Sequence, residues 1–177
     1  CKAGRFAESI GKSECTSCAS GFYVTAMGRT KCNLCQDGSM TNTLINTGAT
    51  SCSQCEKGRF SPQSSVKCTK CSTGRYASNT AMTACDTCQS GSETNTLTVT
   101  GASSCKVCQP GKFSSKSTIA CTNCNTGSYA ASGGTVECIQ CALGSFASAK
   151  GASTCVKWRN CPEGEGKATD GNIRTNI

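Results

Sequence analysis

The sequence lacks histidine, and its 177 residues include a single Trp and three Pro. Without His, the chain has no base for a Ser-His-Asp triad or a Cys-His pair, and no imidazole ligand for zinc. Five Phe and three Tyr leave few large side chains for a hydrophobic core. No apolar stretch approaches the roughly 18–20 residues of a membrane-spanning helix. We therefore expect no enzyme, no catalytic or cofactor-binding residue, and no direct membrane span in this segment, with the mode of anchoring unknown.

Neither positive nor negative charge is concentrated in one part of the sequence. Lys and Arg number 18 against 10 Asp and Glu, a formal net charge of +8, but no run of five or more basic residues occurs. A nucleic-acid binder more often shows a basic stripe with stacking aromatics. The ten carboxylates are scattered and form no acid/base pair, and no phosphate-cradling loop is present. The charges predict a mildly cationic, solvated surface and no nucleic-acid partner.

Cysteine is what the chain has in abundance, with 19 residues. A cysteine content above roughly 8–10% in a short chain is typical of secreted, disulfide-framed scaffolds. Ser and Thr add 47 residues, a composition that would favour disorder without cross-links. Covalent bonds must therefore supply the stability. Because 19 is odd, at least one sulfur is free or has a partner outside the chain.

The cysteines belong to one repeated motif. Eight Cys-x-x-Cys pairs follow one another, and a Gly stands three residues after the second Cys of every pair, as it does after Cys1 and Cys161. Met40, Glu93 and Gly166 are the exceptions to a second rule, an aromatic residue two positions beyond that Gly. The aromatic residues that follow the rule are Phe6, Tyr23, Phe60, Tyr76, Phe113, Tyr129 and Phe146.

A longer period of 53 residues is superimposed on this motif, since Cys15, Cys68 and Cys121 are equally spaced. Two long loops that share Thr-Asn-Thr-Leu, at 41–44 and 94–97, repeat with the same period. We divide the chain into a partial module at 1–14, a first 53-residue repeat at 15–67, a second at 68–120, a divergent third repeat at 121–160, and the start of a further module or an irregular tail at 161–177.

No segment shows a sustained 3.6-residue apolar period, so helices are not expected. Each unit has room for a short β-hairpin or an irregular turn, and its Gly suits a positive φ or a close approach to a neighbouring unit. The expected fold is a small disulfide-rich repeat protein, an elongated ladder of short β-hairpin or irregular cysteine-rich modules with little or no helix. Each unit is expected to touch only its neighbours, as in a quasi-one-dimensional array.

A ladder of disulfides, in which the second Cys of one pair bonds to the first Cys of the next, uses each sulfur once for any number of pairs. Interlocked bonding of adjacent pairs, such as Cys15 with Cys32 and Cys18 with Cys35, requires pairs to be taken two at a time and remains the alternative. Cys161 is left unpaired or inter-chain, and we expect either a window cut from a longer array or a bond to a neighbouring molecule. The ladder joins Cys1–Cys15, Cys18–Cys32, Cys35–Cys52, Cys55–Cys68, Cys71–Cys85, Cys88–Cys105, Cys108–Cys121, Cys124–Cys138 and Cys141–Cys155.

Structural zinc is a third interpretation, because Cys-x-x-Cys pairs at such spacings can hold the metal through four thiolates. The missing His, the odd number of cysteines and the three pairs per 53-residue period all argue against it. We therefore expect no metal and no cofactor.

Two segments of the repeat resemble the cysteine-rich modules of the growth-factor-receptor class, which includes ephrin-receptor-like repeats. One runs from Cys1 through Phe6 to Cys15, and the other from Cys55 through Phe60 to Cys68. The low charge, the abundant Ser and Thr and the near-verbatim 53-residue repeats are similar to ciliate immobilisation antigens and related surface coat proteins. This resemblance implies an extracellular, cell-surface protein of a kind that is abundant and lipid-anchored.

Two functions follow as hypotheses. The first is a structural protein, an extended disulfide-stapled rod that forms a cell-surface coat or filament, with itself or other coat proteins as partners in a possible homopolymer. The alternative is a receptor or adhesion ectodomain that binds a protein ligand through the Thr-Asn-Thr-Leu loops or through segment 156–160, where Trp158 is expected to be a packed cap against Cys155 or Cys161. The chain has no Asn-x-Ser/Thr sequon, so any glycan of the coat would be O-linked. The exposed threonines expected to carry one are Thr41, Thr43, Thr94, Thr96 and Thr98.

Overall fold

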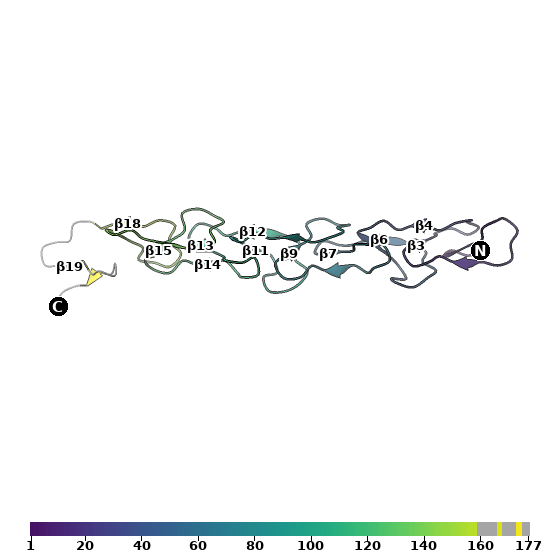
Figure 1. Cartoon of the computed structure of the whole chain (residues 1–177), viewed down its shortest axis with the longest axis horizontal. Helices are drawn as coiled ribbons and strands as arrows, with labels where there is room; N and C mark the ends of the chain where they lie inside the picture. Colours follow the sequence, from purple (N-terminus) through teal and green to yellow (C-terminus); the bar gives the residue numbers. More distant parts are fainter. Residues whose placement is uncertain (159–165, 168–172, 175–177) are drawn as a thin grey trace. The chain divides into compact units, whose positions relative to one another are not determined.

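The structure is a computed structural model that describes residues 1–158, 166–167 and 173–174. Cys161 lies outside the described residues. Those that are described form no helix, and their short strands pair as antiparallel hairpins of two strands each (Figure 1). The expected fold class, tandem cysteine-rich modules of short hairpins, is confirmed.

The strands are two or three residues long. They are β1 (Arg5–Phe6), β2 (Thr16–Ser17), β3 (Phe22–Tyr23), β4 (Asn33–Leu34), β5 (Ser39–Thr41), β6 (Cys52–Gln54), β7 (Arg59–Phe60), β8 (Thr69–Lys70), β9 (Arg75–Tyr76), β10 (Asp86–Thr87), β11 (Ser92–Thr94), β12 (Cys105–Val107), β13 (Lys112–Phe113), β14 (Thr122–Asn123), β15 (Ser128–Tyr129), β16 (Ile139–Gln140), β17 (Ser145–Phe146), β18 (Val156–Lys157), β19 (Gly166–Lys167) and β20 (Ile173–Arg174).

The described part of the chain contains nine disulfides, each joining the second Cys of one pair to the first Cys of the next. We call each segment between two bonded cysteines a module, and number the modules 1 to 9 in chain order. The bonds that define modules 1 to 9 are Cys1–Cys15, Cys18–Cys32, Cys35–Cys52, Cys55–Cys68, Cys71–Cys85, Cys88–Cys105, Cys108–Cys121, Cys124–Cys138 and Cys141–Cys155.

Each hairpin closes around its own disulfide. In module 4, β7 pairs with β8 so that Arg59 lies opposite Lys70 and Phe60 opposite Thr69. The second strand therefore lies just beyond the closing Cys68, within the Cys-x-x-Cys pair. The N–H of Cys71, which opens the next module, donates to the carbonyl of Gly58 at 2.9 Å. The Cys-x-x-Cys pair thus completes one hairpin and begins the next.

The chain divides into two compact units, Cys1–Thr87 with Thr98–Ser104, and Cys88–Leu97 with Cys105–Ile177. Both units have the same kind of core, made of cystine sulfur and small side chains. The largest fully buried residue is Val24, followed by Thr41 and Thr94. The aromatic residues of the repeat are only half-buried. The core therefore depends on many small side chains packed beside disulfides.

Candidate interaction surfaces

The repeated glycine, three residues after the Cys that opens a module, faces another module. Gly58 has a φ of 80°, a left-handed conformation that side chains other than Gly rarely adopt. A Cβ built on Gly58 would overlap the carbonyl oxygen of Gly101 in module 6. We call this residue the module glycine. The same overlap with a carbonyl oxygen two modules further on is found for Gly4 with Gly48, Gly38 with Ala81, Gly91 with Gly134 and Gly111 with Gly151.

The modules therefore contact the module after next as well as their direct neighbours. The expectation that each unit touches only its neighbours is wrong. Its physical reason is the missing side chain of the module glycine, which lets a backbone carbonyl from a more distant module approach.

The residue that reaches the module glycine occupies a constant position, four residues before the Cys that closes its own module. We call it the turn residue. The turn residue Gly101 donates its N–H to the carbonyl of Cys71 in the preceding module at 2.7 Å. Gly151 likewise donates to the carbonyl of Cys124 at 2.8 Å. One turn thus joins three consecutive modules.

A small residue, three positions beyond the module glycine, completes the contact between direct neighbours. The N–H of Gly58 donates to the carbonyl of Ala77 at 2.9 Å, and the N–H of Ala77 donates to the carbonyl of Ala102 at 3.0 Å. Ala77 is fully buried. Sequence reasoning missed this position and the turn residue. Their signals were present, because the small residue is Ala, Val, Ser or Thr in all nine modules and the turn residue is Gly, Ala or Ser.

The long loop at 41–49 is held together by its own polar side chains. The hydroxyl of Thr41 donates to the carbonyl of Leu44 at 2.7 Å, which holds Leu44 at a φ of 59°. The side chain of Asn42 accepts from the N–H groups of Thr50 and Ser51. The second loop repeats the first feature, with Thr94 donating to Leu97 at 3.0 Å and Leu97 at a φ of 53°. Much of the Thr-Asn-Thr-Leu motif is therefore used to build the loop.

The hydrophobic side chains that the two long loops expose to a partner are aliphatic. Leu44 and Ile45 are 43% and 65% exposed, and Leu97 and Val99 are 41% and 61% exposed. Thr41 and Thr94 have no exposed surface, so the prediction that they are exposed and could carry O-glycans is wrong. Their buried hydroxyl groups donate hydrogen bonds to the carbonyls of Leu44 and Leu97, as a polar group shielded from water requires.

Trp158 takes the place of a cysteine. It follows Cys155 by three residues, the spacing of a Cys-x-x-Cys pair. Its backbone N–H donates to the carbonyl of Gly144 at 2.8 Å, as the backbone N–H of an opening Cys does. Its ring packs on Phe146 with the ring centroids 4.6 Å apart. Trp158 is therefore packed against Phe146, whereas the prediction named Cys155 or Cys161, and Cys161 lies outside the described residues.

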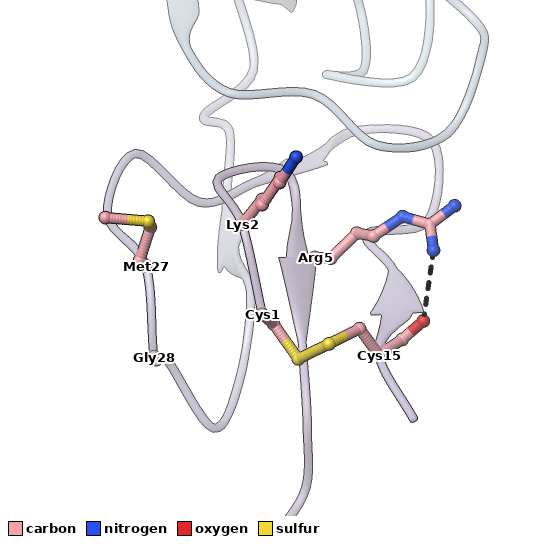
Figure 2. A pocket seen from close by; sticks show the side chains of 6 residues that line it. All are labelled: Cys1, Lys2, Arg5, Cys15, Met27 and Gly28. Carbon is pink, nitrogen blue, oxygen red and sulfur yellow. Dashed lines mark hydrogen bonds between the residues drawn. A yellow bond between two sulfur atoms is a disulfide. The ribbon is translucent and has the colours of Figure 1, made fainter. Parts of the chain in front are cut away.

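An open depression of about 570 Å³ lies beside the first disulfide (Figure 2). It is lined by Lys2, Arg5 and the Cys1–Cys15 bond of module 1 and by Met27 and Gly28 of module 2. The guanidinium of Arg5 lies 3.5 Å from the carbonyl oxygen of Cys15. Met27 is 76% exposed. The depression combines sulfur, cationic side chains and an exposed thioether.

The described cysteines are all in disulfides, which leaves no thiolate among them for zinc. Within the described ranges, no group of three or more His, Cys, Asp or Glu residues is arranged to hold a metal ion. The same residues contain no helix long and apolar enough to cross a membrane.

Comparison with known protein families gives one match. Residues 111–155, which comprise modules 7 to 9 without the first three residues of module 7, are similar to the family described as tyrosine-protein kinase ephrin type A/B receptor-like. No curated protein matches the chain. The match supports a disulfide-rich, ephrin-receptor-like cysteine-rich region, a type of module that forms and persists in oxidising, extracellular environments.

Proposed function

We propose that this chain is an extracellular structural protein whose stacked modules form a cell-surface coat or surface filament. The observation that carries this proposal is the repetition of one backbone contact from module to module. The residues that set the repeat apart, namely the module glycine, the turn residue and the small residue, are used to stack modules. Because all three kinds of residue take part in stacking, none of them forms a single distinctive binding or catalytic site. We propose that the chain acts without catalysis.

The surface supports the same proposal. Thr and Ser are distributed over every module, and the stretches of sequence that differ between the 53-residue repeats are short. A coat protein must be soluble over its whole length and stable to exposure outside the cell, which dense disulfides and a polar surface provide. The proposal includes a location at the cell surface. It also includes the similarity in composition and repeats to ciliate surface antigens.

A receptor or adhesion ectodomain is the second candidate. It is favoured by the ephrin-receptor-like match at residues 111–155 and by the exposed aliphatic pairs on the two long loops. Leu44 and Ile45 would then contact a protein ligand directly. Singly exposed apolar side chains are common on proteins, so this candidate depends on a ligand being found.

Electron microscopy of native surface material, labelled with antibody to the purified chain, separates the two. A continuous coat or regular filaments that carry the label are expected for the structural protein. Sparse label on a smooth surface, together with saturable binding of a soluble protein that Leu44→Asp with Ile45→Asp abolishes, would instead establish the receptor. A matched control is Thr43→Asp, which adds one charge to the same loop beside the aliphatic pair.

A further inference from the structure

Two basic residues lie directly opposite each other in the hairpin of module 4. Arg59 of β7 pairs with Lys70 of β8, so both side chains project from the same face of this two-stranded hairpin. Lys70 is exposed and Arg59 is half-buried. Like charges directly opposite each other destabilise a hairpin. An anion bound beside the two cations would remove that repulsion.

The protein itself supplies no such anion. Neither Arg59 nor Lys70 forms an ion pair with a carboxylate of the described residues. The sequence has no Asp or Glu between Glu56 and Asp86. The positive charge of this hairpin is therefore available to an anionic group from outside the chain.

The structure holds both cationic side chains in place. The Nη1 of Arg59 donates to the carbonyl of Cys68 at 3.2 Å, which uses one of the five N–H groups of the guanidinium. The Cγ and Cδ of Lys70 lie 3.5 and 3.4 Å from a Cβ built on the turn residue Gly101. The methylene stem of Lys70 thus packs on a turn, while its ammonium stays in water. Side chains that are already positioned lose less freedom when a ligand binds.

The equivalent hairpin of the next 53-residue period has one cation in place of two. In module 7, Lys112 lies opposite Asn123. The Cγ of Asn123 lies 3.2 Å from a Cβ built on the turn residue Gly151, so Asn123 covers its turn as Lys70 does. Arg5 of module 1 also has a neutral partner across its hairpin. The pair of facing cations thus distinguishes module 4 from two modules of the same design.

The face that carries this pair offers ionic contacts and few others. The second cross-strand pair, Phe60 with Thr69, belongs to the opposite face of the hairpin, so its ring does not lie beside the cations to stack on a nucleic-acid base. In modules 4 and 5, where every residue is described, the one large hydrophobic side chain that is exposed is Val66, at 38%. One such side chain is too little for insertion into a membrane surface.

Three further cations surround the pair in the sequence, since Lys57, Lys67 and Arg75 are all exposed in modules 4 and 5. They raise the positive potential of this region and so favour the approach of a polyanion. Disulfide-rich modules persist in extracellular environments, which is where acidic polysaccharides occur. A hydrophilic polymer with repeated anionic groups fits a polar, cationic surface without hydrophobic or stacking contacts.

We propose that Arg59 and Lys70 form a binding site for the sulfate and carboxylate groups of an acidic extracellular polysaccharide. The guanidinium binds such an anion through two parallel N–H groups, and the ammonium adds a compact charge beside it. This site goes beyond the proposed structural function, because it attaches the chain to a second component of the cell surface.

Heparin, which carries sulfate and carboxylate groups, is the probe for this site. Titration calorimetry with the full oxidised chain measures its dissociation constant at physiological ionic strength and at rising salt. We expect binding that weakens steeply as salt is added, because each cation that contacts the polyanion releases a counterion.

Lys70→Asn is the decisive variant, because it gives module 4 the side chain that module 7 has at the same place. The fold should be retained, as Asn123 packs on its turn residue without difficulty. We expect the dissociation constant to rise about tenfold, equivalent to about 1.4 kcal/mol. The slope of log K against log salt should become less steep by about one. Lys70→Arg keeps the charge and should bind heparin as the unmodified chain does.

Lys112→Asn is the matched control. It removes the same charge from an exposed residue of an equivalent hairpin that lacks a second cation, so the dissociation constant should rise by about twofold or less. Asn123→Lys is the converse variant, because it places a second cation opposite Lys112. It should build a second site and strengthen the binding of heparin.

The proposal is overturned if heparin does not bind at physiological ionic strength. It is also overturned if Lys112→Asn weakens binding as much as Lys70→Asn does, since the attraction would then belong to the whole cationic chain. Vesicles that contain phosphatidylserine are the competing probe. Tighter binding of these vesicles than of heparin, lost in Lys70→Asn, would assign the pair to a membrane surface and contradict the polysaccharide site.

The outcome is separable from that of the proposed structural function. None of these variants changes a module glycine, a turn residue or a small residue, so a failure to bind heparin would leave the coat or filament standing. Heparin binding through Arg59 and Lys70, together with native surface material that shows no coat or filament, would support the site and contradict the structural function.

Discussion

Gly58 and Gly144 hold the same position in their modules and lie in opposite surroundings. Both have a positive φ, 80° and 84°, but Gly58 is covered by the carbonyl of Gly101 while Gly144 has open space within the described residues. Gly is therefore required for two reasons in the interior of the array and for one at module 9. The comparison separates the conformational need for Gly from the need for close backbone approach.

Reduction of the disulfides should have the largest effect and should remove the difference between the surroundings of Gly58 and Gly144. Each bond closes a loop of about 15 residues, which stabilises the fold by about 3 kcal/mol through the unfolded chain. The small cores of individual modules cannot replace that contribution. Mild reductant is expected to make all nine modules protease-sensitive together, whereas a metal chelator should change nothing.

Peptide mapping without reduction provides the control, because it reads the connectivity directly. The ladder predicts fragments that join Cys55 to Cys68 and Cys71 to Cys85. Fragments that join Cys55 to Cys71 would contradict it. Loss of structure when a chelator is added under oxidising conditions would support structural zinc and contradict the disulfide ladder.

Gly58→Ala and Gly144→Ala should differ by the cost of the close contact alone. Both place Ala at a positive φ, which costs about 1–2 kcal/mol. At Gly58 the added Cβ also overlaps the Gly101 carbonyl, and such overpacking adds about 1–3 kcal/mol. Amide hydrogen exchange in module 4 should therefore accelerate far more in Gly58→Ala than exchange in module 9 does in Gly144→Ala. Equal acceleration would mean that close approach contributes nothing.

Thr41→Val tests a buried polar contact that module 1 lacks, since Ala7 occupies the corresponding position. The hydroxyl of Thr41 is replaced by a methyl group of similar size, and the carbonyl of Leu44 loses its donor at 2.7 Å. Loss of one partner of a buried hydrogen bond costs about 1–3 kcal/mol. Proteolysis at the 41–49 loop is expected to become faster. Thr43→Val, in the same loop and only half-buried, should have a smaller effect.

Trp158→Ala should have the smallest effect and should be confined to module 9. The packing of Trp158 on Phe146 contributes about 0.5–1.5 kcal/mol beyond the area it buries. Exchange protection in β17 and β18 is expected to fall while modules 3 to 5 are unchanged. Trp158→Phe keeps an aromatic ring and should retain most of the protection. A change that spreads to module 4 would show that the cap acts on the whole array.

The pattern of residues was enough to predict the absence of helix and the short hairpins, and it favoured a ladder of bonded pairs over interlocked pairing, because cysteine spacing can be counted. It also predicted that the module glycine has a positive φ or a close neighbour. It could not tell which neighbour. Gly58 meets Gly101, 43 residues away, and nothing in a single motif indicates that the turn of the module after next reaches back so far.

The polar loops show a second limit. The repeated Thr-Asn-Thr-Leu looked exposed, since Thr and Asn are usually at the surface. In the folded chain, the hydroxyl of Thr41 faces the carbonyl of Leu44 and is fully buried, while the aliphatic Leu44 and Ile45 are exposed. A short core without large side chains has room for a small hydroxyl that is hydrogen-bonded. Composition alone therefore placed Thr41 and Thr94 on the wrong side.

The amino-acid sequence by itself determined that the chain is cross-linked by disulfides, and it favoured the ladder over interlocked pairing, because cysteine spacing, the lack of His and the repeated Gly are all local features of the chain. The stacking of modules was decided only by the tertiary structure. The contact of Gly58 with Gly101 depends on where the carbonyl of Gly101 lies in space. Small residues recur at the turn position and at the position three beyond the module glycine, but that pattern does not say which module's carbonyl each one meets.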